Sequence, residues 1–295
     1  MRPRPIRFAS LEPVERDATF GGSRLALCQE KAGQPGRKYL IEDRGIDWAT
    51  ISKFRMGYVP FSAPSDLGGR IVIPIFDAYD QLVVLSVRPV YKLITKRDGE
   101  EVVAFDLKGV ADEYHFFDPF GNPQKMKMSE ASEVGEHKPK YWNEVYAKGE
   151  HLFGLNLARK SIMESGFAIL VEGQIDVAMM HSYGLTNTVG VLGGAFTPIH
   201  AQLLKRWTKQ IVVLMDGDQA GQGHASKVNE ILKFFEAKPI NNHARTSLQH
   251  CVVTLPKNYD PDTFVRKHGS YAIRQNVMTQ LVASGMTFAK EWVAA

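Results

Sequence analysis

Two stretches in the second half of the chain combine a short apolar run with an abrupt polar end. The first reads AILVEGQID (residues 168–176) and the second IVVLMDGDQAGQG (residues 211–223). Each β-branched and apolar run leads into acids and glycines and then into a helix-like pattern, which is typical of a buried parallel strand in an α/β sheet. Four such β/α alternations over residues 168–255 predict an open parallel sheet covered by helices on both faces.

The first half of the chain shows a different pattern. Residues 1–37 are rich in Arg, Pro and Gly with little periodicity, which predicts a basic arm, either partly ordered or lying on nucleic acid. Residues 38–60 predict a helical hairpin whose second helix is capped by Asp47. Two β-hairpins should follow, the first over residues 70–90. The polar stretch 121–150 has few apolar anchors, so we expect a surface segment there.

These patterns divide the chain into four parts and define its fold class as α/β. We predict a basic arm over residues 1–37 and a mixed α+β subdomain over residues 38–160. The parallel-sheet domain should cover residues 161–265, and a terminal helical segment residues 266–295.

Composition narrows the class of protein without naming a function. The 295 residues are 44% apolar and 23% charged, as in an ordinary globular protein, and a net charge of +4 permits a polyanionic partner. The cysteines, Cys28 and Cys251, lie far apart and outside any CxxC motif, so we expect neither zinc nor a disulfide framework. No apolar run approaches membrane length, which predicts a soluble cytoplasmic protein with no membrane partner.

Acidic residues gather where the predicted strands end. Glu172 ends the first strand; Asp216 and Asp218 end the second, where residues i and i+2 point to the same side. Carboxylates at one sheet edge repel each other unless a cation lies between them, which predicts Mg²⁺ or Mn²⁺. Three further acids are expected to complete a site for two or more such ions: Asp176, Asp260 and Asp262. Taken singly, these three could instead be acids of a first helical turn or a surface turn.

The pair EGQID and DGDQAG resembles the signature of the Toprim superfamily, which includes bacterial primases, topoisomerases and some nucleases. Segments outside this pair resemble the catalytic core of bacterial primases of the DnaG type, over roughly residues 38–270. They are the YLIEDRGIDWATISKFRMGYVP stretch, the hairpin at 70–90, PKYWNEVYAKG, LGGAFT and LPKNYDPD. Departures occur as well: Ser86 and Val87 replace the glycines before Arg88, and Asn258-Tyr259 replaces the usual glycine-lysine.

The resemblance implies roles for particular residues. It implies catalytic roles for Glu172, Asp216 and Asp218, with Glu172 a metal ligand or general base, and metal coordination by all six acids. Positions that contact nucleotide or template in the family are matched by Arg70, Arg88, Lys140, Asn143 and Lys148. The arginines and lysines could also be ordinary exposed charges. Gly193 and Gly194 allow the backbone to approach a phosphate, although a tight strand-to-helix turn needs glycines in any case.

The resemblance implies a DNA primase, a nucleotidyltransferase that makes short RNA primers from nucleoside triphosphates on single-stranded DNA. Such primases carry a zinc-binding domain and a helicase-interaction domain, and neither is recognised here. We therefore expect a reduced, phage-like version, in a bacterial or phage-infected cell, that depends on a helicase or single-strand-binding protein. Two alternatives stay open: a metal-dependent Toprim nuclease, and a non-catalytic replisome adaptor that binds single-stranded DNA. A topoisomerase is less favoured, because it needs a nucleophilic tyrosine on a large additional domain.

Overall fold

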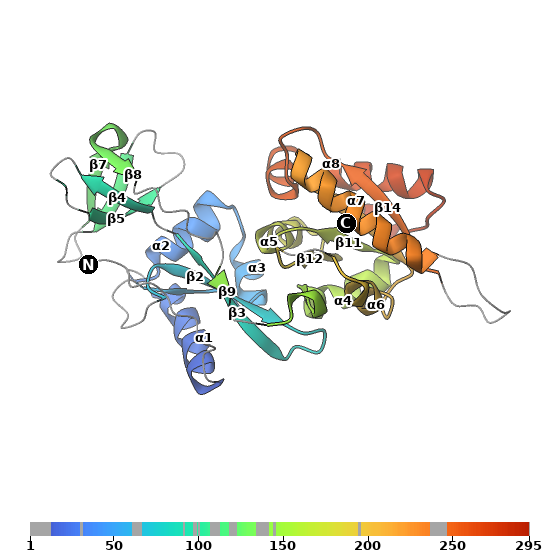
Figure 1. Ribbon diagram of the computed structural model, residues 1–295, viewed down its shortest axis with the longest axis horizontal. Coiled ribbons are helices and arrows are strands. Elements are labelled where there is room, and N and C mark those ends of the chain that lie inside the picture. The colour runs from blue at the N-terminus through green and yellow to red at the C-terminus, as the bar shows by residue number, and fades with distance from the viewer. Residues whose placement is uncertain are drawn as a thin grey trace. The chain divides into compact units, whose positions relative to one another are not determined.

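The chain forms two compact units in the computed structural model (Figure 1). The first contains Met1–Ile75 and Val84–Tyr146, and the second contains Phe76–Val83 and Ala147–Ala295. The structure describes residues 13–29, 32–60, 67–90, 92–96, 99, 101–106, 113–117, 123–133, 142–143, 146–193, 196–236 and 247–294.

The first unit begins with helical segments. α1 (Pro13–Cys28) packs against β1 (Gly57–Val59), so this part of the expected basic arm is a helix of the unit. A Cβ atom at Gly57 would clash with Ser23 of α1, so the glycine permits the close contact. Asp47 caps a later helix as predicted, since its Oδ1 accepts a hydrogen bond from the Thr50 amide at 2.8 Å. The helical segments after α1 are α2 (Gln34–Arg37), the π-helical η1 (Lys38–Asp43) and α3 (Trp48–Lys53).

Two antiparallel sheets complete the first unit. One has the order β1-β2-β3-β9, with β2 (Arg70–Phe76), β3 (Leu82–Pro89) and β9 (Trp142–Asn143). The other has the order β7-β6-β5-β4-β8, with β4 (Lys92–Lys96), β5 (Glu101–Asp106), β6 (Glu113–Phe117), β7 (Pro123–Lys127) and β8 (Ala131–Glu133). Both predicted hairpins are present. Within the expected surface segment at 121–150, the structure adds β7, β8 and β9, which were not predicted, because backbone pairing with neighbouring strands orders residues that have no apolar pattern.

The second unit contains the predicted parallel sheet. Its order is β10-β12-β11-β13-β14, with β10 (Leu152–Phe153), β11 (Ala168–Val171), β12 (Thr188–Val191), β13 (Gln210–Met215) and β14 (Gln249–Thr254). The last four strands are parallel, and every residue of β11 and β13 is buried. The short edge strand β10, which pairs antiparallel with β12, was not predicted.

Helices cover both faces of this sheet, as predicted. α4 (Leu155–Ser165), α6 (Pro198–Leu204) and α7 (Gln219–Glu236) share one apolar core with inward residues of the strands. α5 (Gln174–Ser182) and α8 (Pro261–Ala283) pack together and against the strands, outside that core and on the opposite face of the sheet. The terminal helix is α9 (Glu291–Ala294). α4 spans residue 160, where the sequence suggested a domain boundary, because the helix packs on β12. None of the helices in the described ranges is long and apolar enough to cross a membrane.

Candidate metal centre

The acidic motifs of the second unit meet at one edge of its sheet. β13 lies between β11 and β14 and is parallel to both, so the carboxyl ends of the three strands are neighbours. Glu172 directly follows β11, Asp216 directly follows β13, and Asp260 precedes α8 after β14. This edge is where ligands bind in open α/β sheets.

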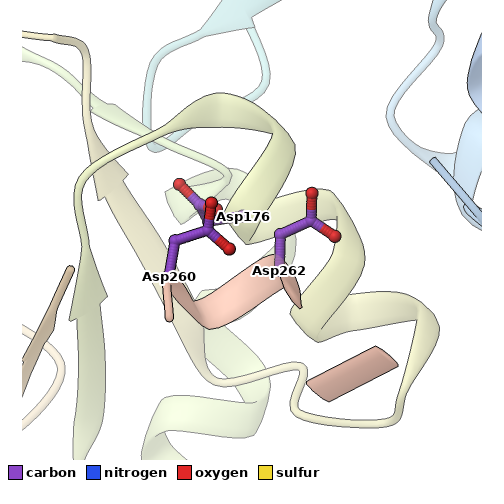
Figure 2. A group of neighbouring side chains, drawn as sticks. All are labelled: Asp176, Asp260 and Asp262. Carbon is purple, nitrogen blue, oxygen red and sulfur yellow. The ribbon is translucent and has the colours of Figure 1, made fainter. Parts of the chain in front are cut away.

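Three carboxylates form a compact cluster at this edge. Asp176 comes from the first turn of α5, Asp260 is the N-cap residue of α8, and Asp262 lies in the first turn of α8 (Figure 2). One oxygen atom of each residue lies within 4.8 Å of those of the other two. Asp262 is buried, and the other two are half-buried. Oxygen atoms of carboxylates at this spacing are the ligands that Mg²⁺ and Mn²⁺ prefer.

The electrostatics of Asp176 show that the cluster suits a cation. The pKa of Asp176 is raised to about 7, first by burial and then by the negative charges of Asp216, Asp260 and Asp262. The hydrogen bond from the Gly173 amide to Asp176 Oδ2, 3.0 Å long, opposes this rise. Four carboxylates therefore share one electrostatic site, and a divalent cation would remove their mutual repulsion.

Local hydrogen bonds fix two members of the cluster. Asp260 Oδ1 accepts hydrogen bonds from the amide and the hydroxyl of Thr263, at 2.6 and 2.5 Å. Both bonds use Oδ1, so Oδ2 can serve as a metal ligand. Asp262 Oδ1 pairs with Arg266 Nε at 2.7 Å, one helical turn further along α8. The cap and the ion pair restrict both side chains before any ion binds.

Close backbone packing brings the DGD turn against the turn that precedes Asp260. The Gly217 amide donates a hydrogen bond to the Tyr259 carbonyl at 2.8 Å, and a Cβ atom at Gly217 would clash with the carbonyl of Pro256. Asn258, in this turn, adopts φ +68°. Asparagine tolerates this left-handed conformation better than most residues, so the turn keeps its shape.

Glu172 and Asp218 have different partners from the three clustered aspartates. Glu172 Oε2 lies 2.9 Å from Nδ1 of His224 on α7. Asp218 is exposed, and its Oδ1 accepts a hydrogen bond from the Gly221 amide at 2.7 Å, which caps the start of α7. Our sequence analysis missed His224. The only signal for it was a histidine three residues after the DGDQAG block.

Several residues that were expected to contact nucleotide or template lie in the first unit. Arg70 is buried, and its Nη1 donates a hydrogen bond to the Gly68 carbonyl at 3.0 Å. The Arg88 guanidinium lies 5.4 Å from the centre of the Tyr39 ring, a cation–π contact. Asn143 of β9 pairs with Ser86 of β3. Lys140 lies outside the described residues.

Lys148 belongs to the second unit, where hydrogen bonds hold its backbone in place. It is exposed and begins a short 3-10 helix, η3 (Lys148–Glu150). His200 Nε2 lies 3.2 Å from the Lys148 carbonyl, and Thr197 Oγ1 donates a hydrogen bond to the Gly149 carbonyl at 2.6 Å. Among the predicted phosphate-binding glycines, Gly193 is exposed with φ +64°, and Gly194 lies outside the described residues. The start of α6 therefore anchors the segment that presents Lys148.

The contribution of His200 to stability should depend on pH. Burial lowers the pKa of His200 by more than its hydrogen bonds to the backbone of Lys148 and His151 raise it, so the folded protein favours the neutral ring. The stabilisation that depends on the neutral ring should be complete above about pH 6.5 and should be lost as the pH falls through the lowered pKa. We expect His200→Ala to lower the free energy of unfolding by about 1–2 kcal/mol at neutral pH and by less in acid, measured by chemical denaturation.

Thr197→Ala provides the control, because it removes a cap of about 1 kcal/mol without removing a titrating group. Its cost should be the same at both pH values. A cost of His200→Ala that did not change with pH would contradict the prediction.

Known proteins resemble this chain both in its second unit and over most of its length. Residues 166–240 match the family model for the Toprim domain. The DNA primase of Aquifex aeolicus is 31% identical over 242 residues, which cover 80% of this chain and 43% of the relative. The DNA primase of Clostridium acetobutylicum is 30% identical over 252 residues, which cover 82% of this chain and 37% of the relative. The chain therefore spans less than half the length of these curated relatives.

Solved structures extend the match to most of the fold. The Aquifex aeolicus primase structure, which contains zinc-binding and RNA polymerase domains, superposes with a TM-score of 0.64 at 24% identity, over 94% of this chain and 64% of that chain. The structure of the DnaG primase catalytic domain bound to ssDNA gives 0.63 at 22% identity, over 90% and 77%. Residues 166–240 of the chain thus carry a Toprim domain. The chain has the fold of the catalytic core of DnaG-type primases, which confirms the resemblance drawn from the sequence.

Proposed function

We propose that this chain is the catalytic core of a DNA primase, which makes RNA primers on single-stranded DNA by metal-dependent nucleotidyl transfer. The observation that carries the proposal is the cluster of Asp176, Asp260 and Asp262, which is coupled to Asp216 and lies within a Toprim domain. The alignment with bacterial DNA primases over 80% of the chain supports the choice of primase among Toprim enzymes.

The acidic residues would have different roles in the reaction. Asp176, Asp216, Asp260 and Asp262 would hold Mg²⁺ or Mn²⁺, and Asp218 would support them from the same turn. Bound ions of this kind neutralise phosphate charge and lower the pKa of an attacking hydroxyl. Glu172 would accept the proton of the primer 3′-hydroxyl. The freed oxygen would then bond to the α-phosphorus of the incoming nucleotide, and pyrophosphate would leave.

Basic residues would bind the phosphates of the substrate or the template. Lys148, on its anchored segment, suits a phosphate contact, and the same role is proposed for Lys140, Arg70 and Arg88. Asn143 would add a polar contact, and the turn at Gly193 and Gly194 would let backbone amides approach a phosphate. A helicase or a single-strand-binding protein would be the protein partner of the chain on the same single-stranded template.

The direct test is incorporation of labelled ribonucleotides on single-stranded DNA with Mg²⁺ or Mn²⁺. The native chain should make short RNA products, and an Asp216→Ala, Asp218→Ala double variant should make none. Because Asp216 is coupled to the cluster and Asp218 caps α7, folding of the variant must be checked by thermal unfolding.

The other outcomes separate the alternative functions. Metal-dependent degradation of the template would assign the site to a Toprim nuclease. Binding of single-stranded DNA with neither synthesis nor cleavage, in the presence of metal and a helicase, would favour the adaptor.

A further inference from the structure

Glu172 pairs with His224, and the proposed function gives His224 no role. The side chain of Glu172 is 29% exposed and that of His224 is 46% exposed, so burial alone does not restrict either one. Nδ1 of the imidazole nevertheless lies 2.9 Å from Oε2 of the carboxylate. An ionised carboxylate only accepts hydrogen bonds, so Nδ1 must carry the hydrogen and donate it.

The helix that carries His224 is fixed against the sheet. Val228 and Leu232, four and eight residues further along α7, are buried in the core between the helix and the sheet. Positions i, i+4 and i+8 lie on one face of a helix, so His224 continues the stripe that faces the sheet. The stripe changes from apolar residues to histidine towards the start of α7, near the end of β11. At the start of α7, Gly221 packs directly against the backbone of Asp216, which limits any shift of the helix.

We propose that His224 is a positioning residue that orients Glu172 as the proton acceptor of the reaction and keeps it apart from the aspartate cluster. The inference rests on the proposed primase function, because Glu172 has no proton to accept without it. A glutamate side chain has three rotatable bonds, and a hydrogen bond from a fixed helix selects among its rotamers.

The kinetic test compares three substitutions on α7. His224→Ala should lower kcat about 10-fold to 100-fold and leave the KM for nucleotides unchanged. His224→Asn, whose amide nitrogen can take the place of Nδ1, should recover most of the loss. Ser226→Ala, an exposed change on the same helix, should have no effect. Equal losses for His224→Ala and His224→Asn, or no loss for either, would overturn the proposal.

A second readout separates positioning from metal binding. The Mn²⁺-induced rise in Tm should be the same for the native chain and His224→Ala, because the aspartates hold the ion. A smaller rise in the variant would make the imidazole part of the metal site and would overturn the proposal.

A third readout does not depend on any catalytic activity. Nitrogen NMR of the native chain at about pH 8, above the ordinary pKa of histidine, should show His224 with its hydrogen on Nδ1. Glu172→Ala should remove the acceptor and shift the ring toward the Nε2–H tautomer. If the native chain made no primers, the proposed function would fail, whereas a native ring with hydrogen on Nε2 would overturn the pairing itself.

Discussion

Replacement of Asp176 by asparagine should strongly reduce primer synthesis and make the metal-free protein more stable. Asparagine keeps an oxygen that can accept the hydrogen bond from the Gly173 amide, so the local fold should survive. The substitution removes one negative charge from the cluster of carboxylates. The pKa of Asp176, raised to about 7, shows that this charge is unfavourable in the folded protein. A metal ligand contributes several kcal/mol to the transition state, so its loss should lower the rate by about a thousandfold.

The stability effect of Asp176→Asn has a definite pH dependence. A carboxyl group with a raised pKa in the folded state destabilises the protein most above that pKa, and the penalty disappears below the unfolded value, near pH 4. The variant should therefore be more stable than the native chain by on the order of 2 kcal/mol above pH 7, and equal to it in acid. Thermal unfolding with a chelator checks this result.

Addition of Mn²⁺ should reverse the order of the two proteins. The native chain should gain Tm as the ion offsets the repulsion, and Asp176→Asn should gain much less. Glu164→Gln is the matched control, since it removes one negative charge from an exposed position on α4. It should change neither the activity nor the response to metal. An active Asp176→Asn variant with a full response to Mn²⁺ would contradict the assignment of the metal centre.

The sheet of the second unit could be predicted because its strands are buried on both faces. Runs such as those of β11 and β13 then consist of apolar residues from end to end, and acids mark where each run leaves the core. The sheet-covering helix α7 was predicted from its apolar stripe, in which Val228 and Leu232 are buried. α1 escaped prediction because two central glycines lower its helix propensity, and packing on β1 stabilises it instead.

The composition of the metal centre was harder to predict than its location. Sequence order places six acids at one edge of the sheet, but side-chain contacts depend on the length and shape of each turn. The structure brings Asp176 to Asp260 and Asp262 through the starts of two helices, whereas Glu172 pairs with His224. Spacing along the chain carries no information about a contact between residues that are 52 positions apart.

Gly221→Ala should destabilise the protein and lower its activity, although alanine is the better helix former. In an ordinary helix this change stabilises by about 1 kcal/mol. At Gly221 the added Cβ atom would clash with the carbonyl oxygen of Asp216, and the next nearest atoms, the carbonyl carbon and Cβ of Asp216, are not the end of a flexible side chain that could move away. The required shift should cost about 1–3 kcal/mol. It would also displace Asp216, and a displacement of about 1 Å at a catalytic group can lower the rate 100-fold.

Gly223→Ala, two residues further along the same helix, isolates the cause. A Cβ atom at Gly223 would meet nothing within 4 Å, so this substitution should raise the free energy of unfolding by about 0.5–1 kcal/mol and leave the activity unchanged. Chemical denaturation and primer synthesis, measured on both variants, give the comparison. Both substitutions replace glycine by alanine in the same helix. If Gly221→Ala lowers the free energy of unfolding and Gly223→Ala raises it, the difference comes from the contact with Asp216. Stabilisation by both substitutions would show that the DGD turn can move away from α7, and that its close packing does not position Asp216.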